Sequence, residues 1–301
     1  SNRGIYIIFR NLKEKNLFSP DGREGFFIFG NGRMCESCYI IGRGVGQVMF
    51  RNNAVSGALM LIGIACNAWQ QALLALLGCF VATAAAFFSG YSKQDIEDGL
   101  YGFNGTLTGI AAGVFLEPGW GMLGMAVCGA ALSSWVVRLL GRQKWLPGFT
   151  APFILVVWLI LAVCRLWFPS LLLTSEPAVA AEPSFFRAFS LHLGQVMFQG
   201  DTVLSGLFFL AAIVIQSRVQ VLYAVWGALL PLAMAWMPAV SYGDFNAGLF
   251  GYNAVLCAMA LGDRSWRGAA WATLAVAVSV ALQVWGLREG VVTLTAPFVV
   301  S

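Results

Sequence analysis

Three short strings in this chain occur twice, in the same order and at nearly constant spacing. They are GQVMF at 46–50 and 194–198, GLYGFN at 99–104 with GLFGYN at 248–253, and TAPF at 150–153 and 295–298. Matched strings at constant spacing are typical of an internal duplication. The chain is therefore predicted to fold as two related halves, with its function where the halves face each other.

Composition indicates that both halves lie in a membrane. Hydrophobic residues make up 59% of the chain and charged residues 11%, whereas soluble domains carry about 25% charged residues. From about residue 45 onward, apolar stretches of membrane-spanning length follow one another between short polar turns. Lipid offers the backbone no hydrogen-bond partner, so such stretches must be helical. We predict an all-α polytopic membrane protein.

The apolar stretches form two sets of five spans. We expect spans at 54–67, 69–89, 99–117, 119–139 and 147–168, and again at 202–216, 219–239, 246–262, 267–286 and 291–301. These sets define a first repeat at 45–168 and a second at 191–301, joined by a linker at 169–190. Residues 1–44 are polar, basic and rich in glycine, and three origins stay open: a cytosolic tail, an expression remnant or an out-of-register translation.

An odd number of spans makes the second repeat enter the membrane from the opposite side. The repeats are therefore predicted to be inverted about an axis in the membrane plane. With the N-terminus inside, the inside loops would hold Lys93, Arg138, Arg142, Lys144, Arg218, Arg264 and Arg267, and the outside loops Arg165, Arg187 and Arg288. The positive-inside rule then predicts cytoplasmic termini in a cell inner (plasma) membrane.

A short re-entrant helix is expected ahead of the five spans of each repeat. Gln47 and Gln195 lie in short apolar stretches, and each is followed three residues later by an aromatic residue, Phe50 or Phe198. An amide at membrane depth needs a partner and usually faces the protein interior. The alternative is a glutamine that faces lipid headgroups. Two copies favour the re-entrant interpretation.

The TAPF strings predict a row of oxygen acceptors near mid-membrane. Pro152 removes a backbone donor, so carbonyls just before it lose their helical partners. Free carbonyls in hydrocarbon are tolerated where they line a cavity. Thr150 and Thr295 add hydroxyls beside them. A single copy would be interpreted as an ordinary proline kink, but two copies in inverted halves favour a site for a ligand rich in N–H donors.

Taken together, these strings resemble the urea transporter family. The motifs are a full LPxxTxPF at 146–153, a second TxPF at 295–298, and the paired QVxF and GLxG[FY]N strings, covering about residues 45–298. The resemblance implies a homotrimer in which each protomer has its own pore at the repeat interface. It implies aromatic clamps at Phe50, Phe103, Phe198 and Tyr252, hydroxyls at Thr150 and Thr295, apolar walls at Val48, Leu107, Val196 and Leu256, and mouth amides at Gln47 and Gln195.

The expected activity is passive, channel-like flow of urea down its gradient. Urea is flat, neutral and rich in N–H donors, so facing rings would admit it and an acceptor row would replace its bonds to water. No charge moves, and the spans show no pattern of acidic residues; His192 is the single histidine. Neither an enzyme site nor a cofactor is expected. Cys35 and Cys38 form a lone CxxC, too little for a metal site, and the basic residues form no nucleic-acid stripe.

Two alternatives stay open. An ion-coupled transporter of another small amide or amine would need a titratable group at mid-membrane. A non-conducting remnant would explain the departures of the second copy: no Leu-Pro before its TxPF, Tyr252 in place of phenylalanine, and an end at Ser301 where the first copy continues to about Phe168. On this interpretation the second repeat is expected to lack its last half-helix.

Overall fold

The computed structural model describes residues 36–141, 148–174, 179–180, 182–237 and 240–301. Several predictions lie outside these ranges: most of the segment 1–44 with Cys35, the inside cations Arg142 and Lys144, the Leu146-Pro147 pair, and parts of the linker. The regular structure within the described ranges is helical, apart from one isolated bridge between Leu116 and Leu172.

The helices of the two halves follow the same order. The first half is built from α2 (Glu36–Gln47), α3 (Ala54–Asn67), α4 (Trp69–Phe88), α5 (Lys93–Glu97), α6 (Gly102–Phe115), α7 (Trp120–Gly141) and α8 (Ala151–Trp167), followed by the 3₁₀ helix η1 (Pro169–Leu171). The second half is built from α9 (Phe185–Gly194), η2 (Gln195–Met197), α10 (Val203–Gln216), α11 (Arg218–Leu229), η3 (Leu230–Trp236), α12 (Tyr242–Asn246), α13 (Tyr252–Leu261), α14 (Trp266–Arg288) and α15 (Ala296–Val300). Each helix from α2 to α8 thus has a counterpart from α9 to α15.

The helices agree with the all-α membrane fold class predicted from the sequence. By length and composition, four helices of the described part could cross a membrane: α4, α7, α14 and the continuous stretch Arg218–Trp236. Helices α3, α8, α10 and α13 are apolar but shorter. The outer surface is also apolar, since Phe88 is 85% and Trp120 89% exposed. Such a surface suits lipid rather than water.

Helix starts coincide with side-chain oxygens that cap them. Asn53 accepts hydrogen bonds from the Val55 and Ser56 backbone N–H groups at the start of α3. Thr202 does the same for Leu204 at the start of α10. The short helices α5 and α12 begin after Ser92 and Ser241. These caps explain why the expected spans at 54–67 and 202–216 begin within a residue of the observed helices.

Glycines bring α4 and α6 into backbone contact. A Cβ on Gly78 would lie 2.1 Å from the Gly105 carbonyl oxygen, and a Cβ on Gly105 would lie 2.3 Å from the Gly78 carbonyl oxygen. Small residues at such a crossing let two helices approach closely in a membrane. This contact fixes α6, which carries Phe103 and Asn104, against the long helix α4.

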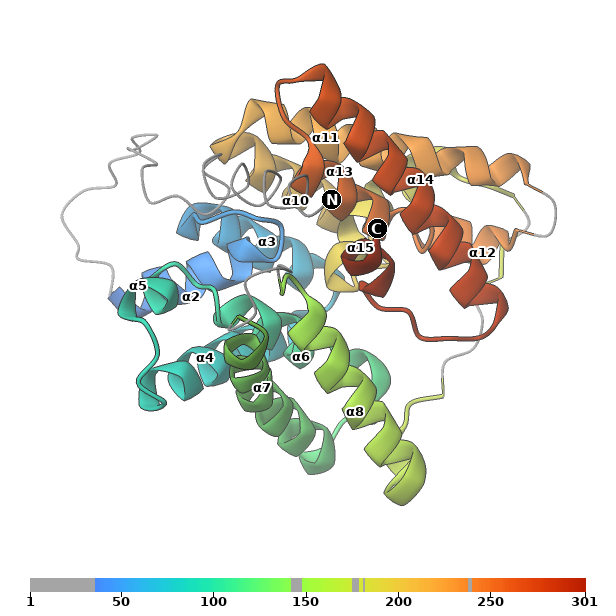
Figure 1. Ribbon diagram of the computed structural model, residues 1–301. Coiled ribbons are helices and arrows are strands. Elements are labelled where there is room, and N and C mark those ends of the chain that lie inside the picture. Colours follow the sequence, from blue (N-terminus) through green and yellow to red (C-terminus); the bar gives the residue numbers. More distant parts are fainter. Residues whose placement is uncertain (1–35, 142–147, 175–178, 181, 238–239) are drawn as a thin grey trace, which may run out of the picture.

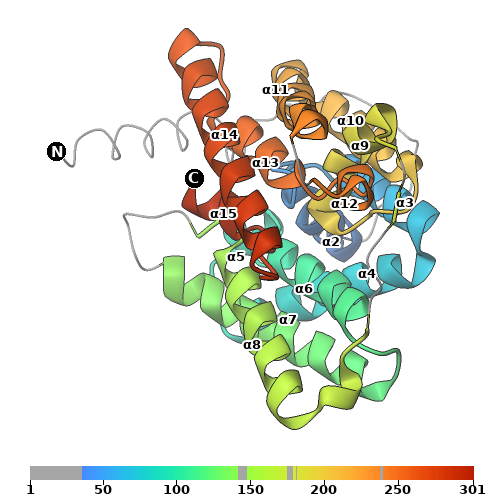
Figure 2. The same cartoon turned by 90° about the vertical axis from the view of Figure 1, so that its right-hand side faces the viewer.

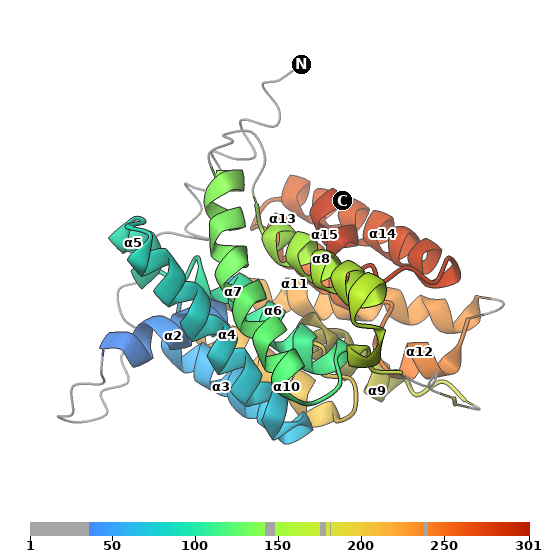
Figure 3. The same cartoon turned by 90° about the horizontal axis from the view of Figure 1, so that it is seen from below.

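The two halves lie beside each other and meet along short helices. In Figure 1 the first half, blue to green, lies below the second half, yellow to red, and Figure 2 shows the same division from the side. Helices α3 and α10 pack across the boundary, where the Ser56 hydroxyl donates to the Ala212 carbonyl at 2.8 Å. Figure 3 shows α15 between α8 and α14.

Candidate functional site

The two TAPF strings meet at the boundary between the halves. Thr150 Oγ1 lies 2.7 Å from Thr295 Oγ1, which is a hydrogen-bond distance, and both side chains are buried. Each threonine stands directly before a helix, α8 or α15. The contact joins the same position of each half, so it marks the place about which the two halves are related. We call this place the centre.

The sequence pattern suggested that the prolines interrupt helices, but in the structure they lie in the first turn of a helix. Helix α8 begins at Ala151 rather than at residue 147, so Pro152 falls in its first turn. Pro297 occupies the same place in α15. A proline there loses no helical hydrogen bond, because first-turn N–H groups have no partner within the helix. The carbonyls that precede each proline therefore belong to the chain entering a helix.

Asn104 braces the start of α8 from the neighbouring helix α6. Its Nδ2 donates to the Phe149 carbonyl at 3.3 Å, and its Oδ1 accepts from the Phe153 backbone N–H at 3.1 Å. The asparagine thus holds both sides of the turn that contains Thr150. Its burial is complete, so these bonds replace the water that the amide gives up.

Asn253 braces the start of α15 in the same way. Its Nδ2 donates to the Leu294 carbonyl at 3.2 Å, and its Oδ1 accepts from the Phe298 N–H at 3.2 Å. Sequence reasoning missed both asparagines, although they end the repeated GLxG[FY]N strings. The repeat of a costly polar residue inside an apolar span was the signal that could have found them.

The first turn of α8 offers no free backbone donor. The N–H groups of Ala151, Phe153 and Ile154 each have an acceptor within 3.1 Å, and Pro152 has no N–H. A helix N-terminus with free N–H groups attracts anions. Here those groups are already used, so the centre presents oxygen atoms. Such a centre suits a ligand that donates hydrogen bonds.

Phenylalanines contact each other across the halves in a reciprocal pattern. The Phe50 ring lies 6.0 Å from the Phe298 ring, and the Phe198 ring lies 6.0 Å from the Phe153 ring. Phe50 corresponds to Phe198, and Phe298 to Phe153, so the exchange of halves reproduces the contact, as a two-fold arrangement requires. Both contacts are edge-on rather than stacked.

The backbone is left-handed at four corresponding positions around this centre. The φ angles are +59° at Phe50 and +61° at Phe198, and +34° at Phe149 and +50° at Leu294. Left-handed backbone costs a non-glycine residue about 1–3 kcal/mol. A strained conformation that occurs at matching positions of both halves is maintained by the surrounding packing.

A cavity of about 240 Å³ lies beside Thr150 in the first half. Five of the predicted site residues line it: Gln47, Val48, Phe50, Phe103 and Thr150. We call it the first-half cavity. The structure thus brings these five together, and it adds Val137, Gly148 and Phe149 to the lining.

The other predicted residues lie around this centre without lining the first-half cavity. Leu107, Val196 and Leu256 are buried in the same hydrophobic core as Phe50 and Tyr252, and Phe198 packs against that core. Gln195 donates from Nε2 to the Ala247 carbonyl at 2.9 Å. Leu107 lies on α6 of the first half, and the other predicted residues that do not line the cavity lie in the second half.

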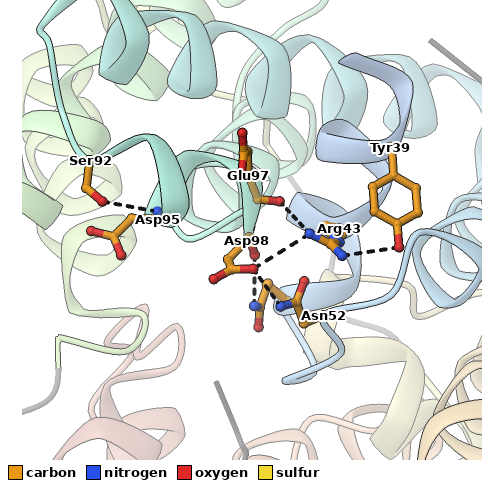
Figure 4. Close-up of polar contacts among 8 residues, drawn as sticks. Tyr39, Arg43, Asn52, Ser92, Asp95, Glu97 and Asp98 are labelled. Carbon is orange, nitrogen blue, oxygen red and sulfur yellow. Dashed lines mark hydrogen bonds and ion pairs between the residues drawn. The ribbon is translucent and has the colours of Figure 1, made fainter. Parts of the chain in front are cut away.

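Asp98 organises the polar residues around Gln47, which lines the first-half cavity. Figure 4 shows its carboxylate between Arg43, 3.6 Å away, and the Asn52 amide, which donates at 3.0 Å. The Asp98 backbone oxygen accepts from Gln47 Nε2 at 2.9 Å. Gln47 Oε1 is buried and has no partner among the described residues. It is an acceptor held beside the cavity.

Comparison with known proteins gives a consistent picture. A family model described as "Urea transporter" matches residues 38–301. The chain is 31% identical to Urea transporter 1 of Rattus norvegicus over 258 residues, and 30% identical to the proteins of that name from Mus musculus and Ovis aries. Each match covers 80% of this chain, which spans 66% of the length of these relatives.

Proposed function

The chain belongs to the urea transporter family, and from that premise we propose that it carries urea passively across the membrane between two inverted repeats. Membership makes it a multi-pass membrane transport protein and not an enzyme. The observation that supports the proposed route is the contact of Thr150 with Thr295 beside the first turn of α8, whose N–H groups already have acceptors.

Hydrogen-bond chemistry at the centre fits a donor-rich solute. The two threonine hydroxyls can accept, and the Phe149 carbonyl keeps a lone pair beyond its bond to Asn104. Gln47 Oε1, which has no partner among the described residues, adds an acceptor beside the first-half cavity. Urea presents N–H groups on both sides of a flat, neutral molecule. It would therefore exchange its bonds to water for bonds to these oxygens.

Passage through the centre would exchange one hydrogen bond for others. The bond between Thr150 and Thr295 must open for a solute to pass. Each hydroxyl can then bond to the solute, so the net cost stays near the modest worth of one hydrogen bond, about 1 kcal/mol. Weak binding at several sites keeps exit fast, which a passive route requires.

Buried charge argues against a cationic solute. Arg51 directly follows Phe50 and is 3% exposed, and its Nε donates to the Met49 carbonyl at 3.0 Å. A guanidinium in a medium of low polarity raises the cost of bringing Na⁺ or an ammonium group nearby. A neutral solute is not affected in this way.

The alternative of ion-coupled transport has one observation in its favour. His192 is fully buried in α9, with Nδ1 2.8 Å from the Ala228 carbonyl and Nε2 without a partner among the described residues. Its ring fills the space that Gly251 leaves open. The first half has Gly44 at the matching position, so the group is not repeated. We therefore favour passive transport. A variant at His192 distinguishes it from ion-coupled transport.

Urea permeability of proteoliposomes, followed by stopped-flow light scattering, tests the proposal. We expect urea flux well above that of empty liposomes, and the same flux with or without an imposed H⁺ or Na⁺ gradient. Flux no greater than that of empty liposomes, from protein that is folded and inserted, would refute urea transport. Flux that follows the ion gradient and loses that dependence in His192→Gln would establish the alternative instead.

The remaining proposals concern assembly and orientation. We propose a homotrimer with a pore in each protomer, on the basis of the family resemblance. We also propose cytoplasmic termini in the cell inner membrane, on the basis of the loop charges. Cross-linking in native membranes and labelling of Lys93 from each side of the membrane would test these two points.

A further inference from the structure

The two halves differ at three positions that surround the second TAPF string. In the first half, Phe103, Val137 and Gly148 line the first-half cavity. Their counterparts in the second half are Tyr252, Gln283 and Thr293. Val137 and Gln283 are matched because each lies 17 residues after the first residue of its helix, α7 or α14. Each change adds a polar group.

The three second-half side chains lie together as one buried polar group, which we call the second-half cluster. Thr293 Oγ1 donates to Gln283 Oε1 at 2.8 Å, and the Tyr252 hydroxyl lies 3.3 Å from each of these two oxygens. Gln283 is 2% exposed, and Tyr252 and Thr293 are each 8% exposed. Where the first half has a cavity, the second half has three polar side chains packed together.

The surrounding helix makes room for the second-half cluster. A Cβ on Gly286 would lie 2.1 Å from Thr293 Cγ2, so Thr293 needs a glycine on α14. At the matching places the first half has Leu140 and Gly148, with the large and small residues reversed. The two halves therefore fill the space beside the centre with different combinations of large and small side chains.

The second-half cluster also uses an acceptor that the first half leaves available. The Tyr252 hydroxyl donates to the Leu294 carbonyl at 2.6 Å, and Asn253 Nδ2 donates to the same oxygen at 3.2 Å. A carbonyl has two lone pairs, so this one is fully occupied. Phe103 has no hydroxyl, so the Phe149 carbonyl keeps one lone pair for a ligand.

We propose that Tyr252, Gln283 and Thr293 make the second half the narrower end of the route and set the size limit of the solute. The second-half cluster passes urea but excludes ureas that carry a methyl group on nitrogen, because the methyl group meets packed side chains. The Leu294 carbonyl already accepts two hydrogen bonds, so it cannot offset this cost by bonding to the solute. This inference rests on the proposed function and names the residues that decide its substrate range.

A variant that copies the first half tests the size limit. Tyr252→Phe, Gln283→Val and Thr293→Gly together remove the polar groups of all three side chains. Asn253 Nδ2 loses its 3.1 Å bond to Gln283 Oε1 but keeps its bond to the Leu294 carbonyl, just as Asn104 bonds to the Phe149 carbonyl in the first half. We expect the ratio of methylurea to urea permeability to rise about tenfold, with urea flux retained. Ser279→Ala, one turn earlier on α14, is the matched control and should leave the ratio unchanged. An unchanged ratio in a triple variant that still conducts urea would overturn the proposal.

A second measurement does not depend on conduction. Thr293→Cys and Gly148→Cys are compared for their rate of reaction with a small water-soluble thiol reagent, followed by peptide mass spectrometry so that native cysteines are distinguished. We expect Gly148→Cys to react at least several-fold faster, and Thr293→Cys to accelerate when Tyr252→Phe and Gln283→Val are added. Equal rates would overturn the proposal, even if the triple variant failed to fold. Absent urea flux in the unchanged protein would refute the proposed function alone, because the labelling still measures the narrowing.

Discussion

Thr150 Oγ1 and Thr295 Oγ1 lie 2.7 Å apart although 145 residues separate them in the chain. The contact joins the two halves through a hydrogen bond between hydroxyls, which can be exchanged for bonds to a third molecule. Apolar side chains in the same place would close the centre permanently. The following predictions test this arrangement and the structure that holds it.

Thr150→Val should lower urea flux about tenfold while the protein still folds. The substitution keeps the shape of the side chain and removes one hydrogen bond to the solute, worth about 1–1.5 kcal/mol. Stopped-flow light scattering of proteoliposomes measures the effect. Thr83→Val is the control, because its hydroxyl bonds within α4 to the Cys79 carbonyl. Equal flux for both variants would exclude a role of the Thr150 hydroxyl in transport.

Asn104→Leu should destabilise the protein strongly. The Phe149 carbonyl and the Phe153 N–H would each lose the partner that Asn104 provides, at about 1–3 kcal/mol for each buried group. Thermal unfolding in detergent should therefore occur at a clearly lower temperature. Thr106→Val is a matched control on the same helix, because its hydroxyl donates within α6, to the Gly102 carbonyl, rather than to the start of α8. A similar melting temperature for both variants would contradict the bracing role.

Phe50→Gly should be more stable than Phe50→Ala, by about 1 kcal/mol. Both variants lose the ring, but only alanine must adopt the left-handed backbone at φ +59°. The order should reverse at Phe153, which lies inside α8, because alanine is the better helix former. Melting temperatures of the four variants decide the point. The same order at both sites would mean that Phe50 relaxes out of its left-handed conformation.

Gln47→Leu should lower urea flux, whereas Asp98→Asn should change it little. The leucine removes both the amide that bonds to the Asp98 backbone oxygen and the unpartnered acceptor beside the first-half cavity. The asparagine keeps that backbone oxygen and loses only a partly exposed ion pair with Arg43, worth less than about 1 kcal/mol. Proteoliposome flux distinguishes the two outcomes. If Asp98→Asn has the larger effect, the charge of the Asp98 carboxylate matters more for transport than the Gln47 amide.

The helices could be predicted from the sequence where local patterns decide them. The span expected at 54–67 is α3, because Asn53 caps its start and the polar Asn67 ends it. The repeated strings predicted which residues would meet at the centre, and Thr150 and Thr295 are in contact. Local pattern could not decide whether Pro152 kinks a helix or begins one. That choice depends on Asn104, which lies 49 positions before Phe153 in the chain.

The asymmetry of the two halves could not be predicted in the same way. Tyr252 was noticed as a departure from phenylalanine, but its hydroxyl partners come from α14 and from the chain before α15. Gln283 and Thr293 belong to none of the repeated strings. Their importance depends on distances between segments, which a repeat search does not measure.

The backbone contact between Gly78 and Gly105 determines what kind of motion the first half allows. Because even a Cβ would not fit between the two backbones, little room remains for α6 to move closer to α4. The close packing favours a wall around Phe103 that moves little, so that opening there occurs through rotation of individual side chains. Such rotations take picoseconds to nanoseconds, whereas the rigid-body rocking of alternating-access carriers takes microseconds to milliseconds.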